Sequence, residues 1–231
     1  MMILTDDQRM LQDVVRPLMA ERGAIPAQLR HWRDTGCKDG FGHELWKQLG
    51  DLGLTGMLIP ESAGGAGLGQ VEANLVLEEI GRNLTPSPFL TTSVAAVRAL
   101  EGSAHAERWF PGIVAGETVA ALALDEGKAH GPAAIALQAE RQGNGFLLNG
   151  QKQFVVHGAS ADVILVAART AGSPGERDGL TLFAVERDAA GLQIDNLSMV
   201  DSSKAARLTF DSVSVDADAV IGEVDGGWAP L

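Results

Sequence analysis

Four side chains of this sequence have types and spacing that could do acid–base chemistry. Asp125 and Glu126 are adjacent acids at the end of an apolar run, and His130 and His157 each precede a glycine. Neighbouring residues of a strand point to opposite faces, so the two acids are not expected to act as a paired acid and base. We favour an ion pair or a turn acceptor for Glu126, an exposed loop position over a ligand contact for His130, and a turn position for His157.

Other common kinds of catalytic site find no support in the sequence. The five histidines and the single Cys37 do not have the spacing of metal ligands, either with one another or with paired acids. No Gly-x-Ser-x-Gly elbow is present, which argues against a serine hydrolase. We therefore predict no metal site.

Net charge, hydropathy and cysteine content exclude some classes of binding partner and some cellular locations. The formal net charge of −12 argues against binding to nucleic acid and to anionic lipid surfaces. No apolar run approaches the ~18 residues that a membrane span requires. Cys37 is the only cysteine, which fits a reducing compartment, and we predict a cytoplasmic protein.

The stretch LIPESAGGAGLG, residues 58–69, raises the question of a phosphate-binding loop. Gly65 and Gly67 fit the first two places of a dinucleotide-binding fingerprint, but Gln70 occupies the third, and no Gly-Lys-Ser/Thr follows. Glu61 and Glu72 flank the loop and would repel a phosphate. We therefore expect these glycines to allow sharp turns and close packing.

The hydrophobic period changes from 3.6 to 2 near residue 117. A capping box at Thr5 predicts the start of the first helix, and Pro17 is expected to bend or interrupt it. Further helices are predicted before residue 117. The later helices are expected at 43–54, 70–82, 93–102 and 105–117. Short strands are expected at 118–124, 133–140, 145–150, 152–158, 162–168, 180–186 and 206–216.

The spacing of these strands predicts the class of the second half. The Asn-Gly pairs at 144–145 and 149–150 are typical of tight hairpin turns. No helical segment separates the strands, which favours an antiparallel barrel or sandwich over a parallel sheet. The prediction is an α+β chain of several domains: an all-α domain over residues 1–116 and an antiparallel β-domain over 117–225.

Several motifs, taken in order, resemble the acyl-CoA dehydrogenase family. The loop PESAGGAG (60–67) and the helix end EEIGR (78–82) match the family's N-terminal helical domain. The strands ALALDEG (121–127), KQFVVHG (152–158) and LTFDSVSVDADAVIG (208–222) match its middle β-domain. Each piece is weak alone, but the resemblance runs from about Leu4 to Trp228.

The resemblance implies an FAD-dependent α,β-dehydrogenation of an acyl-CoA thioester. It places the flavin ring between two strands, with Leu122, Leu124 and Asp125 on the first and Phe154 and Val156 on the second. Phe154 stands where the family often has a stacking tryptophan, and an aromatic ring there still stacks. Val156 stands where a threonine often bonds near the flavin N5, so flavin tuning is expected to differ.

The resemblance also implies the substrate side and the electron acceptor. His130 and Gly131 match positions near the thioester and the CoA, so the resemblance implies that they contact the acyl-CoA, although the residue type and place of His130 alone favour an exposed loop position. Electron-transferring flavoprotein is the expected acceptor. No residue of this chain falls at the position of the catalytic base, which the family carries in a C-terminal helical domain, so we assign no catalytic residue.

The segment 226–231 resembles the entry to that third domain. Three interpretations remain open: a truncated or frameshifted product, one half of a heteromer whose partner supplies the base, or a degenerate paralogue. An uncovered apolar helical face is typical of an interface, so we predict a homo- or hetero-oligomer. The alternative function is a non-catalytic scaffold or subunit that binds acyl-CoA or flavin and acts through a partner chain.

Overall fold

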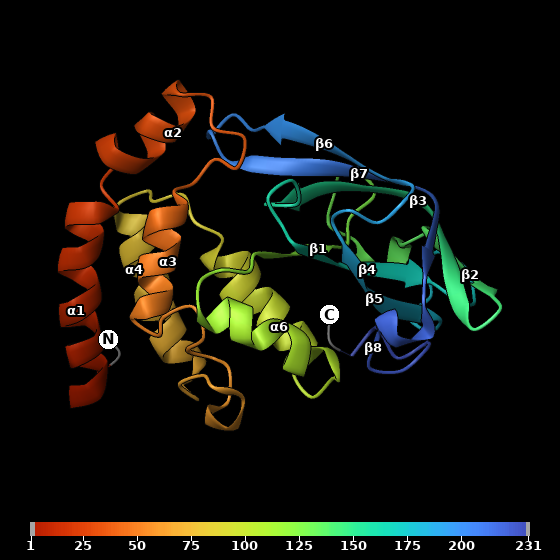
Figure 1. Ribbon diagram of the computed structural model, residues 1–231, viewed down its shortest axis with the longest axis horizontal. Coiled ribbons are helices and arrows are strands. Elements are labelled where there is room, and N and C mark those ends of the chain that lie inside the picture. The colour runs from red at the N-terminus through yellow and green to blue at the C-terminus, as the bar shows by residue number, and fades with distance from the viewer. Residues whose placement is uncertain (1–2, 230–231) are drawn as a thin grey trace.

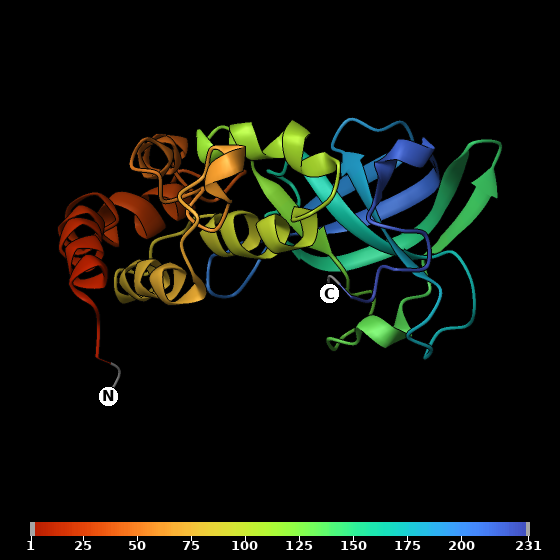
Figure 2. The same ribbon diagram turned by 90° about the horizontal axis from the view of Figure 1, so that it is seen from below.

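The computed structural model describes residues 3–229 and places a helical half beside a β-sheet half (Figure 1). Helix α6, the last of the helical half, lies next to the sheet in both views (Figures 1 and 2). The helical elements are α1 (Asp6–Arg22), η1 (Pro26–Arg30), α2 (His31–Asp34), α3 (His43–Asp51), η2 (Glu61–Ala63), α4 (Gln70–Arg82), η3 (Phe89–Ala96), α5 (Val97–Leu100) and α6 (His105–Val114).

The first helix begins as the sequence predicts. Gln8 N donates to Thr5 Oγ1 (3.2 Å) and Thr5 N donates to Gln8 Oε1 (3.0 Å), which confirms the capping box. Pro17 was expected to bend or interrupt the helix, and of these two alternatives the interruption is wrong, because α1 continues to Arg22. Proline removes only one ladder hydrogen bond, and Met19, two residues further along, is fully buried, so tertiary packing holds the helix together.

The second half is a single eight-stranded sheet. Its path runs β6-β7-β3-β2-β4-β5-β8, and β1 pairs with β4 beside this path. The strands are β1 (Ala120–Ala123), β2 (Gln138–Gln142), β3 (Gly145–Val156), β4 (Val163–Arg169), β5 (Leu180–Glu186), β6 (Leu192–Ser198), β7 (Lys204–Val215) and β8 (Val220–Ile221).

The sheet is mostly antiparallel, as predicted, with two differences. Strands β1 and β2 pair in parallel with β4, because the loop after β1 and the β2–β3 hairpin supply the crossovers that helices usually provide. Over the described residues β6 and β8, at the two ends of the path, do not pair with each other, so the sheet does not close into the barrel that was one of the two expected forms.

One of the two predicted hairpin turns is wrong. Asn144 does lie in the turn between β2 and β3, and Gly145 begins β3 directly after it, but Asn149 and Gly150 lie inside β3. The register against β7 shifts between Leu148 and Gly150, so the pair forms a bulge, and Gly150 has a φ of +142° that favours glycine. The segments 145–150 and 152–158 therefore form one strand with its end turn.

Two further strand expectations need correction. Residues 132–134 form a short 3-10 turn, and β2 begins only at Gln138, so the strand expected at 133–140 is shorter. Strands β6 and β8 were not predicted. Strand β6 is polar and largely exposed, and β8 has two residues, so neither carries a clear alternation.

The two halves share one packed interior. A single cluster of buried side chains includes Leu49 and Trp46 of α3, Ala121 of β1 and Phe210 of β7. Thr92 reinforces the junction, because its Oγ1 accepts from Ala120 N and donates to Ala120 O, both at 3.0 Å. The sheet is thus anchored directly on the helices.

The domain limits stay proposals. The last helix ends at Val114 and β1 begins at Ala120, which is compatible with a boundary at 116/117. Gly227 N donates to Leu180 O (2.7 Å), so the start of the segment 226–231 packs against β5. Residues 1–2, in the proposed first domain, and 230–231, in the proposed last one, lie outside the described residues.

Candidate functional site

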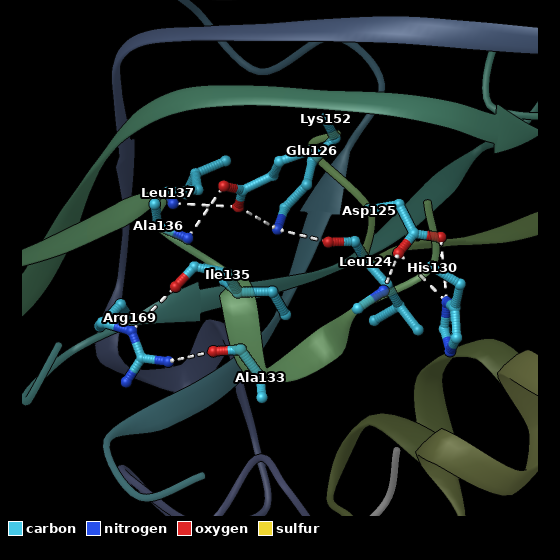
Figure 3. A network of polar contacts seen from close by, with 11 residues as sticks. Leu124, Asp125, Glu126, His130, Ala133, Ile135, Ala136, Leu137, Lys152 and Arg169 are labelled. Atoms are coloured by element: carbon cyan, nitrogen blue, oxygen red, sulfur yellow. Dashed lines mark hydrogen bonds and ion pairs between the residues drawn. The ribbon is translucent and has the colours of Figure 1, made fainter. Parts of the chain in front are cut away.

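The chain after β1 and the end of β3 lie side by side. Gln153 N donates to Asp125 O at 2.7 Å, and Lys152 Nζ donates to Leu124 O at 2.9 Å. The two segments that the sequence predicts to line a common site, 122–126 and 154–158, are therefore neighbours in space. Figure 3 shows the polar contacts around the first of them.

The end of β3 presents two apolar side chains outward. Phe154 is 45% exposed and Val156 is 43% exposed, whereas Val155 between them is buried. This is the alternation of a strand with one covered face. The register against β7 shifts between Lys152 and Val155, and Phe154 has a φ of +54°, so a bulge in β3 sets the direction in which the Phe154 side chain leaves the strand. The exposed ring and methyl groups offer a surface to a flat aromatic ligand.

Leu122 and Leu124 are placed differently from these two residues. Both are half-buried and pack against the second cluster of core side chains, which includes Val97 and Leu165. What this segment offers a ligand is therefore chiefly its backbone. In the described part of the chain no strand pairs with the second edge of β1, where the Thr92 hydroxyl covers Ala120.

Asp125 organises the loop that follows. Its carboxylate contacts His130 Nδ1 at 3.1 Å and accepts a hydrogen bond from Gly131 N at 3.1 Å. The His130 side chain is 68% exposed, so its ring is oriented by Asp125 and remains open to solvent (Figure 3). The structure thus brings Asp125, His130 and Gly131 together, beside Leu124.

Glu126 has the structural role that the sequence favoured. It forms an ion pair with Lys152 (2.7 Å) and accepts hydrogen bonds from Ala136 N (2.8 Å) and Leu137 N (3.0 Å). Burial lowers the pKa of the fully buried Lys152 to about 8, although Glu126 and then Asp125 act in the opposite direction.

Sequence reasoning missed Lys152 itself. The sequence does contain a signal that Lys152 is buried. Phe146 and Leu148 are inward positions of β3, and counting on by twos from them places position 152 on the same inward face. A lysine at an inward position of a strand requires a buried acceptor.

His157 is a turn residue, as favoured, with a role in joining the two halves. It follows β3 with a φ of +58° and is 8% exposed. Its Nε2 lies 3.1 Å from Ser87 O, and its ring meets that of Phe41 edge-on at 5.5 Å. Burial lowers its pKa to about 4, so the ring is neutral at pH 7 and Nε2 donates to the carbonyl.

The glycine loop is a packing device. Gly64 and Gly67 have φ values of +84° and +60°. A Cβ on Gly65 would lie 2.1 Å from Ile59 O, so that position has room only for glycine. Glu72 accepts from Gly69 N at 3.0 Å and already places a carboxylate at the start of α4, where a phosphate would otherwise bind.

A small cavity adjoins the site. It has a volume of about 280 Å³ and is lined by Leu124, Glu126, Gly127, Ala129, Gly131, Ala134 and Ile135. A larger cavity of about 500 Å³ lies elsewhere, between α6 and the end of β5. We assign the site to the smaller one because Leu124 and Glu126, which belong to the first of the two convergent segments, line it.

Residues 3–229 contain no group of three or more His, Cys, Asp or Glu side chains placed to hold a metal ion. None of the helices in this range is long and apolar enough to cross a membrane.

Comparison with known families identifies the fold. The acyl-CoA dehydrogenase N-terminal domain matches residues 5–117, and the acyl-CoA dehydrogenase middle domain matches residues 121–213. The chain belongs to the acyl-CoA dehydrogenase family. These two matches agree with the helical half and the sheet half of the structure.

Individual relatives support this assignment. Mitochondrial isovaleryl-CoA dehydrogenase of Pongo abelii is 33% identical over 97% of this chain, which spans 55% of that protein. The crystal structure of a probable acyl-CoA dehydrogenase from Mycobacterium abscessus superposes with a TM-score of 0.86 at 26% identity, covering 98% of this chain and 61% of that one. The Tcur3481-Tcur3483 steroid acyl-CoA dehydrogenase superposes with a TM-score of 0.83 at 26% identity, covering 99% and 60%. The chain therefore spans little more than half of the relatives it matches.

Proposed function

We propose that this chain forms the N-terminal and middle parts of an FAD-dependent acyl-CoA dehydrogenase. The observation that carries the proposal is that segment 122–126 lies beside the part of β3 that leads directly into 154–158, to which it is joined by the bond from Gln153 N to Asp125 O. Family membership supports an oxidoreductase that acts on an acyl-CoA thioester.

The residues present fit a flavin ring. Phe154 and Val156 are exposed on one face of β3, although both are apolar, so a flat aromatic group would cover surface that otherwise meets water. Leu122, Leu124 and Asp125 would contact the ring through their backbone. Val156 has no hydroxyl, so no side-chain hydrogen bond is available there. Bound FAD would supply the acceptor for the β-hydrogen of the acyl thioester.

The loop after Asp125 would meet the substrate. Gly131 lines the small cavity, and both Gly131 and the preceding His130 contact the Asp125 carboxylate. Their role would be to bind and orient the thioester and the CoA. The family resemblance places the proton acceptor in the family's C-terminal helical domain, so we assign that role to no residue of this sequence.

The partners belong to the same proposal. Met10 and Val14 of α1 are 60% and 52% exposed, which is compatible with an apolar contact to another chain. The neighbour Tcur3481-Tcur3483 combines two named chains, which supports a homo- or hetero-oligomer here. Electron-transferring flavoprotein is the acceptor we propose, and the single Cys37 supports a cytoplasmic location.

A flavin titration tests the proposal. The purified chain is titrated with FAD, and binding is followed by quenching of flavin fluorescence. We expect Phe154→Ala to weaken FAD binding roughly tenfold, because a stacking contact contributes about 1 kcal/mol beyond its buried area. Phe154→Trp should retain the affinity.

Val200→Ala is the matched control, since Val200 is fully exposed on the loop between β6 and β7. A wild-type chain that takes up no FAD would contradict the proposal. Bleaching of the bound flavin by an acyl-CoA would show that the substrate reduces it. Bound FAD that no acyl-CoA bleaches would agree both with a dehydrogenase part whose proton acceptor is supplied elsewhere and with the non-catalytic scaffold that acts through a partner.

A further inference from the structure

Lys152 is a fully buried cation behind the proposed flavin site. Its side chain is 0% exposed and its Nζ donates to Leu124 O (2.9 Å) and to Glu126 Oε1 (2.7 Å) (Figure 3). Lys152 lies two residues before Phe154 on β3, whereas Leu124 and Glu126 belong to the segment after β1. One side chain therefore joins both edges of the site.

Glu126 extends this contact to the loop that carries His130. Its two carboxylate oxygens accept from Ala136 N and Leu137 N, at the end of that loop. The loop 127–137 therefore begins directly after Glu126, and its last two residues bond back to the Glu126 carboxylate. Without Lys152 this half-buried carboxylate would have no cation to balance its charge.

A second buried cation holds the same loop from its carbonyl side. Arg169 is 6% exposed and donates to Ile135 O (2.9 Å) and Ala133 O (3.3 Å). It also donates to Asp178 O and Glu176 O, each at 3.0 Å, in the loop between β4 and β5. The loop 127–137 is therefore held at its N–H groups by Glu126 and at its carbonyls by Arg169.

These buried charges are unlike ordinary core packing. A buried ion pair is often no more stabilising than apolar side chains of the same volume, because desolvation offsets the attraction. Its bonds, however, fix three chain segments at defined positions, which apolar contacts do not. The arrangement therefore favours a role in geometry over a role in stability.

We propose that Lys152 is a positioning residue that, through Glu126, fixes the backbone of 124–126 and the loop 127–137 against Phe154 and so sets the flavin and acyl-CoA site. This inference rests on the proposed function. Arg169 holds the far side of the loop through its bonds to Ile135 O and Ala133 O.

Hydrogen exchange on the chain without ligand tests the first part. Lys152→Met keeps the length of the side chain and removes its charge. We expect exchange to become about tenfold faster at the amides of Ala136, Leu137 and Gln153, while amides of β4 and β5 keep their rates. Unchanged rates at the three amides would overturn the proposal, and so would a uniform increase that includes β4 and β5.

Further variants separate a lost contact from a failure to fold. Glu126→Gln keeps the shape of the partner and decides the question if Lys152→Met does not fold. The double variant should be no worse than Lys152→Met alone, since the two residues act as one unit. Lys47→Met is the control, because Lys47 forms an exposed ion pair with Asp51 on α3 and should leave all these rates unchanged.

FAD titration tests the second part. Lys152→Met should weaken FAD binding about tenfold at a temperature where its circular dichroism equals that of the wild type. The wild-type affinity should also fall between pH 7 and 9, as the ammonium that faces Glu126 and Asp125 loses its proton, whereas the affinity of Lys152→Met should be flat with pH.

The outcomes separate the two proposals. If Lys152→Met binds FAD as tightly as the wild type does, the positioning role is overturned and the proposed function still stands. A wild-type chain that binds no FAD overturns the proposed function and, with it, the role of Lys152 in a flavin site, even if exchange shows that Lys152 orders the loop.

Discussion

At the scale of single residues, His157 shows how burial fixes a protonation state. It lies at the turn after β3, and its ring donates to Ser87 O in the helical half. Protonation would place a charge among buried groups, which lowers its pKa to about 4. The neutral ring therefore stabilises the fold only where the pH keeps it neutral.

His157 should make the stability depend on pH below neutrality. Its folded-state pKa lies below the unfolded value of 6.5, so its contribution is complete above pH 6.5 and is lost as the pH falls towards 4. Between pH 7.5 and 4.5 we expect the free energy of unfolding of the wild type to fall by roughly 2–3 kcal/mol more than that of His157→Asn. Urea unfolding of both proteins at the two pH values measures this difference. His43→Asn is the control, since His43 is 63% exposed, and equal pH dependence of wild type and His157→Asn would refute the prediction.

At the scale of elements, the glycine loop shows why a sequence needs glycine where no ligand binds. The chain turns back on itself between η2 and α4, with Gly65 N donating to Pro60 O at 3.1 Å and Gly67 N donating to Ile59 O at 2.9 Å. Two backbone strands of the loop approach so closely that a side chain has no room. Steric fit therefore accounts for the composition of this loop.

A methyl group at position 65 should be strongly destabilising. A Cβ there would lie 2.1 Å from Ile59 O and 2.6 Å from Gly56 O, and backbone atoms cannot move aside cheaply. We expect Gly65→Ala to lower the free energy of unfolding by about 2–3 kcal/mol. The matched control is Gly64→Asn, which faces open space at a φ of +84° and should cost less than about 1 kcal/mol. Similar losses for both variants, measured by urea unfolding, would show that crowding is not the cause.

At the scale of the whole molecule, the helical half and the sheet behave as one body. Their side chains share a core cluster, and Thr92 bonds both backbone groups of Ala120 across the junction. His157 and Ser87 form a second link on the side of the proposed site. The position of the site relative to the helices therefore depends on these junction contacts.

Removal of the Thr92 hydroxyl should weaken the whole fold. Thr92→Val leaves a buried N–H and a buried carbonyl of Ala120 without partners, so we expect a loss of about 2–3 kcal/mol. Tryptophan fluorescence, which reports mostly on the helical half, and far-ultraviolet circular dichroism should give the same lowered midpoint. Thr91→Val is the control, because Thr91 bonds only to the local Pro88 O. Two separate midpoints would mean that the halves unfold independently.

The sequence by itself determined the features that depend on local pattern. The capping box at Thr5, the limits of α4, the packing role of the glycine loop and the change from helices to strands near residue 117 all follow from neighbours along the chain. The family motifs are also local, which is why the two convergent segments could be named in advance. Their roles in binding stay predictions.

Only the tertiary structure decided the features that join distant segments. The Lys152–Glu126 pair spans 26 positions, Arg169 reaches Ile135 across 34, and β1 pairs in parallel with β4. The Asn149-Gly150 pair became a bulge because the partner strand β7 continues past it. Local periodicity reports which face of an element is apolar, but the partner of a buried charge and the register of a strand are set by packing between segments that the sequence keeps far apart.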